Sequence, residues 1–186
     1  MSTSASPAPI GTITQDDARH PVTLADPKLR AWRAFLHAHV AVMHELEAQL
    51  VSRRGMTLAE YDALVQLAGA PGAHLRMGEL AERVLLSRSG LTRLVDRLVA
   101  QGLVRREHCG SDARGSYAAL TREGVRQLRA AMPVHMAGIA ELFMDVVDDV
   151  DAEAIERAMT AVAATAGHPV RAARTARPQE PGPTDA

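Results

Sequence analysis

Four polar side chains share one face of a helix predicted between Ser87 and Gly102, and their chemistry suits nucleic acid. Apolar residues recur there three and four positions apart, a spacing that places them along one side of a helix. These apolar residues are Leu91, Leu94, Val95 and Leu98. The opposite side carries Arg88, Ser89, Thr92 and Arg93. Such side chains hydrogen-bond base edges and phosphates, and a helix fits the major groove of DNA. We therefore predict a DNA recognition helix.

The sequence also marks both ends of this helix. Ser87 is a good N-cap, because its hydroxyl can accept a hydrogen bond from a first-turn amide, and it is a candidate phosphate contact. Gly102 predicts the stop, because glycine adopts the left-handed conformation that ends helices. Arg97 lies one turn beyond the base-facing set, where it either meets a phosphate or pairs with Asp96. The recognition helix therefore offers both base and backbone contacts.

Flanking segments complete a winged helix-turn-helix over residues 56–120. The run Arg76–Val84 predicts the first helix of the pair, and Arg76 is a candidate for a contact with the DNA backbone. After the recognition helix, the strand-like runs Leu103–Glu107 and Tyr117–Leu120 flank a polar loop over Cys109–Gly115. Such a hairpin, with an arginine near its tip, forms a wing that can reach an adjacent minor groove.

Long apolar helices lie on both sides of this module, over residues 26–54 and 121–167. Asp26 before Pro27 predicts the start of the first, and Asp151 predicts the start of the last. Together they are more apolar than one small module can cover, so we predict a helical dimerisation region in which two copies bury each other. Residues 1–25 and 168–186 are rich in small and polar residues, and we predict disordered tails there.

Composition separates a basic module from an otherwise neutral chain. The 186 residues carry a formal charge of −1, yet the segment from Arg76 to Arg122 holds nine arginines against five acids, a balance near +4. A neutral protein with one basic module is typical of a DNA-binding protein with a separate assembly region. The single cysteine and the lack of a signal peptide or membrane-length apolar run favour a cytoplasmic protein.

Four runs together resemble the MarR family of transcriptional regulators. They are Arg-Met-Gly-Glu-Leu-Ala, Ser-Gly-Leu-Thr-Arg-Leu-Val-Asp-Arg-Leu, Gly-Leu-Val-Arg-Arg and Asp-Ala-Arg-Gly-Ser-Tyr-Ala-Ala-Leu-Thr-Arg-Glu-Gly. The resemblance implies a mainly α fold with a small β wing, and a homodimer that binds a pseudo-palindromic DNA operator as a repressor. In the wing it implies that Arg114 enters the minor groove and that Asp112 orients it.

The resemblance further implies release of the DNA by a small aromatic or drug-like molecule. In the family such effectors enter a cleft between the dimerisation helices and the DNA-binding module. The residues that can line this cleft here are Trp32, Leu36, His39, Met43 and Tyr61. Their helical spacing is equally well explained by core packing.

Other functions leave weaker traces. His37, His39, His44 and His135 can bind zinc or report pH, but no compact His-x-x-x-His pair supports a metal. Oxidation of Cys109 in the wing is a possible redox signal, although thiol sensors of the family carry their cysteine in the first helix. A winged helix that binds protein is a further alternative. No phosphate loop, metal cluster or nucleophile–base pair indicates an enzyme, and no cofactor is expected.

Overall fold

A computed structural model describes residues 26–109 and 112–167, and for residues 108, 109 and 112–115 it describes the backbone alone. The predicted tails over residues 1–25 and 168–186 lie outside the described part. The chain divides into two compact units, one that ends at Gly138 and one that begins at Ile139. Each unit is described by itself.

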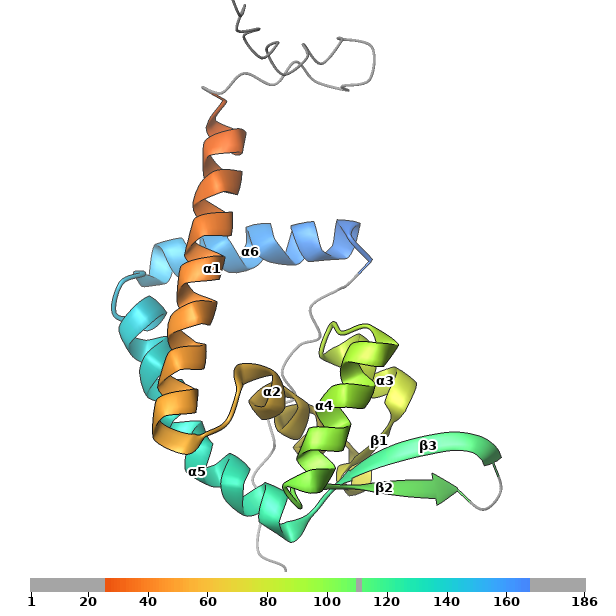
Figure 1. The fold of residues 1–186 in the computed structure, drawn as a ribbon. Coiled ribbons are helices and arrows are strands. Elements are labelled where there is room, and N and C mark those ends of the chain that lie inside the picture. The colour runs from red at the N-terminus through yellow and green to blue at the C-terminus, as the bar shows by residue number, and fades with distance from the viewer. Residues whose placement is uncertain (1–25, 110–111, 168–186) are drawn as a thin grey trace, which may run out of the picture. The chain divides into compact units, whose positions relative to one another are not determined.

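The first unit contains five α-helices and a three-stranded sheet in the described residues (Figure 1). Its elements are α1 (Pro27–Arg54), α2 (Leu58–Ala68), a 3-10 turn (Pro71–Ala73), β1 (His74–Arg76), α3 (Met77–Arg83), α4 (Arg88–Ala100), β2 (Val104–Cys109), β3 (Asp112–Leu120) and α5 (Arg122–Ile139). The predicted fold class, mainly α with a small β wing, is confirmed.

Local chemistry accounts for the ends of several helices of the first unit. Asp26 caps α1 by accepting a hydrogen bond from the Lys28 amide over 2.7 Å, and Gly55 ends the helix at a left-handed φ of 62°. Thr57 and Glu60 form a capping box at the start of α2. Thr121 caps α5, because its hydroxyl accepts the Gly124 amide over 2.9 Å. These caps satisfy amides that a helix start leaves without partners.

The sheet is antiparallel in the order β1–β3–β2, so that β3 lies in the centre. Arg76 of β1 pairs with Tyr117, and Val104 of β2 pairs with Leu120. The predicted loop over Cys109–Gly115 is wrong in length, since β2 extends to Cys109 and β3 already begins at Asp112. The two strands of a hairpin are held together by backbone hydrogen bonds, which polar residues form as well as apolar ones. The polar residues of the hairpin therefore did not indicate where the pairing of β2 with β3 ends.

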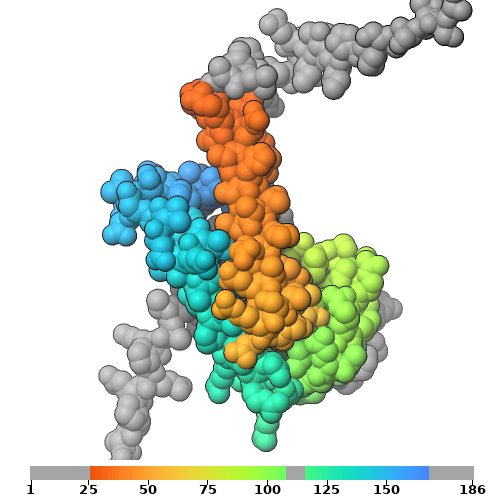
Figure 2. All heavy atoms as spheres, turned by 60° about the vertical axis from the view of Figure 1, so that its left-hand side comes forward, coloured from red at the N-terminus to blue at the C-terminus, as the bar shows by residue number. Residues whose placement is uncertain are grey.

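The core of the first unit lies between α2, α3, α4, the sheet and α5. Its fully buried side chains include Leu50, Leu64, Leu67, Leu80, Leu91, Leu94, Val95, Leu98 and Val104. Of α1, only Leu46 and Leu50 are buried. In the space-filling view the first turns of α1 project beyond the rest of this unit (Figure 2). The packed core therefore supports the predicted winged helix-turn-helix and only the last part of α1.

The second unit contains a π-helical turn over Ala140–Met144 and the helix α6 over Asp149–Thr165. The predicted start at Asp151 is wrong: Asp148 is the cap, and its carboxylate accepts the Asp151 amide over 2.8 Å. Several acidic residues in a row supplied more than one possible cap. No single helix of the described residues is long and apolar enough to cross a membrane, although the segments Arg122–Met144 and Asp149–Thr165 reach that composition as a broken pair.

Candidate nucleic-acid interface

The helix α4, predicted to be the recognition helix, is oriented by its apolar side. Leu91 and Leu94 are 1% exposed, and Val95 and Leu98 are fully buried. Burial of these four side chains in the core turns the opposite side of α4 to solvent. That side presents Arg88, Ser89, Thr92 and Arg93, all of them exposed. The face predicted to contact bases is therefore accessible.

The first turn of α4 is ordered by its own hydroxyl groups. Ser87 caps the helix by accepting the Gly90 amide over 3.1 Å, and its oxygen lies 3.3 Å from the Ser89 hydroxyl. Thr92 donates its hydroxyl proton to the Arg88 carbonyl over 2.9 Å. The Thr92 side chain is thus left to accept hydrogen bonds and to offer its methyl group, a combination that suits base edges.

Arg88 and Arg93 are the cations of this face. Neither guanidinium has a hydrogen bond or ion pair with another side chain among the residues that the structure describes. An exposed, unengaged guanidinium can make two parallel hydrogen bonds to guanine or to phosphate without first breaking an internal contact.

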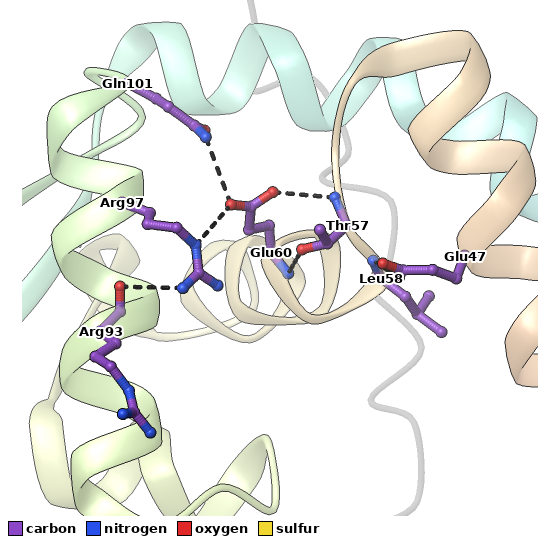
Figure 3. Close-up of polar contacts among 7 residues, drawn as sticks. All are labelled: Glu47, Thr57, Leu58, Glu60, Arg93, Arg97 and Gln101. Atoms are coloured by element: carbon purple, nitrogen blue, oxygen red, sulfur yellow. Dashed lines mark hydrogen bonds and ion pairs between the residues drawn. The ribbon is translucent and has the colours of Figure 1, made fainter.

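Arg97 is paired with Glu60 and not with Asp96, the protein partner that was predicted. Its Nε lies 3.5 Å from Oε1 of the buried Glu60 on α2, and its Nη1 donates to the Arg93 carbonyl over 3.5 Å (Figure 3). Asp96 pairs instead with Arg106, at 2.6 Å. The Asp96–Arg97 pair is therefore not formed, because neighbours on a helix point in different directions. Contact of Arg97 with DNA stays a prediction.

The ion pair between Asp96 and Arg106 also fixes the base of the wing. Asp96 belongs to α4 and Arg106 to β2, so the pair joins the recognition helix to the hairpin. Asp112 and Arg114, the predicted minor-groove pair, lie on β3, but their side chains lie outside the described part, as does that of Cys109. The structure thus shows the support of the wing, and its contacts with DNA stay a prediction.

Arg76 is held at the edge of the sheet. Its Nε donates to the Tyr117 hydroxyl over 2.7 Å, and its guanidinium carbon lies 5.4 Å from the centre of the Tyr117 ring. The two residues are register partners on β1 and β3, and Arg76 is exposed. This contact was not predicted, because forty-one positions separate the two residues.

The predicted ligand-pocket residues divide into two groups. Trp32, Leu36, His39 and Met43 lie exposed along α1. Tyr61 is 6% exposed within the core on α2, where its ring centre lies 4.4 Å from that of His135 on α5. Tyr61 thus fills a core position as well as a predicted pocket position, and the pocket stays a prediction.

Beside Tyr61, burial shifts two ionisable groups. It lowers the pKa of His135 despite the nearby charge of Asp62, and the buried His135 Nδ1 has no hydrogen-bond partner among the described residues. Burial also raises the pKa of the Asp62 carboxyl, while the hydrogen bond from Gln66 and the charge of His135 oppose that shift. Within residues 26–109 and 112–167, no three His, Cys, Asp or Glu side chains are grouped to hold a metal ion.

Comparison with known proteins finds one family. The MarR family model matches residues 54–115. The transcriptional regulator HosA of Escherichia coli O157:H7 is 30% identical over 114 residues, which cover 61% of this chain and 78% of HosA. An uncharacterised HTH-type transcriptional regulator of Bacillus cereus is 28% identical over 119 residues, covering 64% of this chain and 78% of that protein.

Two solved structures from Streptomyces coelicolor share the fold. AbsC, a MarR family transcriptional regulator, has a TM-score of 0.74 at 33% identity and matches over 79% of this chain and 99% of AbsC. Sco3205, a MarR family regulator solved in complex with DNA, has a TM-score of 0.75 at 34% identity and matches over 80% of this chain and 92% of Sco3205. The names of these relatives indicate a transcriptional regulator rather than an enzyme.

Proposed function

We propose that this chain, which belongs to the MarR family of transcriptional regulators, is a homodimeric repressor that binds a pseudo-palindromic operator until a small molecule releases it. The observation that carries the proposal is the exposed face of α4. Arg88 and Arg93 stand there in solvent, while the apolar side of the same helix is buried. A related regulator, Sco3205, was solved in complex with DNA, which supports DNA as the partner.

A pseudo-palindromic operator requires two recognition helices related by a two-fold axis. Two half-sites one turn of DNA apart place such helices about 34–36 Å from each other. One chain has one recognition helix among its described residues, so a second copy must supply the other. The dimer is therefore part of the proposed mechanism and not an independent feature.

The first helix offers a surface for that second copy. α1 has 28 residues, yet five of its large apolar side chains between residue 32 and residue 43 are at least 38% exposed. They are Trp32, Phe35, Leu36, Val40 and Met43. Their spacing places them on one side of the helix. The ring centres of Trp32 and Phe35 lie 5.8 Å apart. A contiguous exposed apolar stripe favours a protein interface, and a two-fold pairing of α1 would bury it.

We expect Leu36→Glu to prevent dimerisation. Leu36 is 41% exposed in the single chain, so glutamate is tolerated there, whereas the dimer would bury its charge. Sedimentation velocity should show a monomer, and operator affinity should fall by roughly 10²–10⁴-fold because the second half-site is lost. Ala34→Glu, on the opposite side of α1, is the matched control and should stay dimeric. A dimeric Leu36→Glu protein would contradict this interface.

Release by a ligand follows from the same geometry. A molecule that binds one dimer geometry better than another shifts the population toward it. If the favoured geometry moves the recognition helices away from the half-site spacing, DNA is released. The predicted occupant is a small aromatic acid or drug-like molecule bound beside Trp32, Leu36, His39, Met43 and Tyr61. Repression follows when the operator overlaps the site that polymerase needs.

We expect the purified protein to bind the intergenic DNA beside its own gene more tightly than scrambled DNA. Affinity should fall steeply between 50 and 200 mM salt, because contacts between arginine and phosphate release counterions. Fluorescence anisotropy with both DNAs at both salt concentrations measures this. Equally weak binding to both DNAs would contradict the proposed function and would favour a protein partner instead.

A further inference from the structure

Glu60 makes more hydrogen bonds than a helix cap requires. It is 3% exposed, and no other charged side chain is buried among the residues that the structure describes. Its Oε2 accepts the Thr57 amide over 3.0 Å, which completes the capping box of α2. A capping box needs that oxygen alone. The second oxygen, Oε1, has no part in the cap and serves a different helix.

Oε1 of Glu60 binds two successive turns of the recognition helix. It accepts hydrogen bonds from Arg97 Nε over 3.5 Å and from Gln101 Nε2 over 3.4 Å (Figure 3). A buried carboxylate is poorly screened by solvent, so its charge attracts both donors, at distances longer than those of short charge-assisted hydrogen bonds. Glu60 therefore joins the last turns of α4 to the start of α2.

This arrangement turns the free edge of the Arg97 guanidinium outward. Nε faces Glu60, and Nη1 reaches the Arg93 carbonyl one turn back along α4. The Arg97 side chain is nevertheless 55% exposed. In Figure 3 the Arg93 side chain extends away from Glu60 while Arg97 lies against it. Arg97 thus presents donors to solvent next to the exposed face of α4, in an orientation set from within the protein.

We propose that Glu60 is a positioning residue of the DNA interface, which holds Arg97 so that its guanidinium contacts a phosphate beside the groove that Arg93 enters. The inference rests on the proposed function, because it concerns the same α4 face. Arg97 makes the contact, and Glu60 acts through it. A guanidinium that is already oriented loses less conformational freedom when it binds a phosphate.

Replacement of Glu60 by glutamine separates capping from positioning. Glutamine keeps the size of glutamate but has one acceptor oxygen and an amide that only donates. That oxygen can accept the Thr57 amide and preserve the cap, which leaves the amide facing the donors of Arg97 and Gln101. Glu60→Gln therefore keeps the capping box of α2 and removes the hydrogen bond that orients Arg97.

The chain offers a matched control in Glu47. This carboxylate of α1 accepts a hydrogen bond from the backbone amide of Leu58, at the start of α2, and so lies at the same junction. Its bond to Leu58 involves no residue of α4. Glu47→Gln therefore makes the same chemical change close to Glu60 without changing the restraint on Arg97.

The test is the salt dependence of operator binding by the full-length protein. We expect Glu60→Gln and Arg97→Gln each to lower the slope of log affinity against log salt by about 0.9, the loss of one phosphate contact. The double variant should bind like Arg97→Gln alone, because Glu60 acts through Arg97. Glu47→Gln should keep the slope of the unmodified protein. The melting temperature of each variant shows whether it is folded. Because Arg97→Gln replaces an exposed side chain, this variant tests the phosphate contact even if Glu60→Gln unfolds.

Three results would overturn the inference. An unchanged slope in a folded Glu60→Gln variant would show that Glu60 does not position Arg97. An unchanged slope in Arg97→Gln would show that Arg97 makes no phosphate contact. A double variant whose slope falls by the sum of the two single effects would show that Glu60 acts by another route. In each case, specific binding by the unmodified protein leaves the proposed function standing. Absence of specific, salt-dependent binding by the unmodified protein contradicts the proposed function itself.

Discussion

Arg93→Ala should abolish most of the preference of this protein for its operator. The side chain is exposed on α4 and has no partner to release among the described residues. A guanidinium that makes two hydrogen bonds to guanine contributes about 1–3 kcal/mol of discrimination. The ratio of operator to scrambled-DNA affinity should therefore fall roughly 5- to 150-fold. Competition binding at fixed salt measures that ratio.

The matched control is Arg126→Ala, which removes the same charge from α5. Arg126 is exposed and pairs with Glu123, away from the face predicted to contact bases. It should leave the affinity ratio unchanged, and the melting temperature of both variants should stay close to that of the unmodified protein. If Arg93→Ala weakens operator and scrambled DNA equally, Arg93 contacts the backbone and not a base. If Arg93→Ala changes the affinity for neither DNA, Arg93 does not contact DNA.

Gly124→Ala should be strongly destabilising although it adds one methyl group in a helix. A Cβ at Gly124 would lie 2.2 Å from the Leu103 carbonyl oxygen and 2.7 Å from Leu120 Cδ1. The Leu103 carbonyl cannot easily move, because it already accepts hydrogen bonds from the amide and the hydroxyl of Thr121. We expect the free energy of unfolding to fall by about 3 kcal/mol, the upper part of the range for overpacking. Urea denaturation at a fixed protein concentration measures it.

Gly78→Ala is the control for the same substitution in another helix. Nothing lies within 4 Å of the position that a Cβ would take at Gly78 on α3. Alanine favours a helix more than glycine does, so stability should rise by about 0.5–1 kcal/mol. Equal effects of the two substitutions would show that the contact between α5 and Leu103, the residue before β2, is not tight. The contrast therefore tests packing and not helix propensity.

Local chemistry made much of this fold predictable from the sequence. Asp26 and Thr57 cap helices through amides at most three residues away, and Gly55 ends a helix by its own φ. The apolar spacing of α4 assigned its buried and exposed sides correctly. These features depend on residues within about one helical turn, so a single segment contains all that determines them.

The length of the wing and the start of α6 were less predictable. Polar residues between Cys109 and Gly115 indicated a loop, but the backbone pairing of β2 with β3 extends into that run. Asp148 and Asp151 are both acceptable caps, and the chain uses the earlier one. In both places the side chains permit several endings, and the choice depends on backbone hydrogen bonds that the sequence pattern does not show.

By itself, the sequence determined the starts of α1 and α4, which side of α4 is buried, and which polar residues its other side presents. The tertiary structure alone decided the partners of those residues: Glu60 for Arg97, Arg106 for Asp96 and Tyr117 for Arg76. The physical reason is distance along the chain. Helical spacing constrains side chains three or four positions apart, whereas these contacts join residues 10 to 41 positions apart, and only the folded core brings them together.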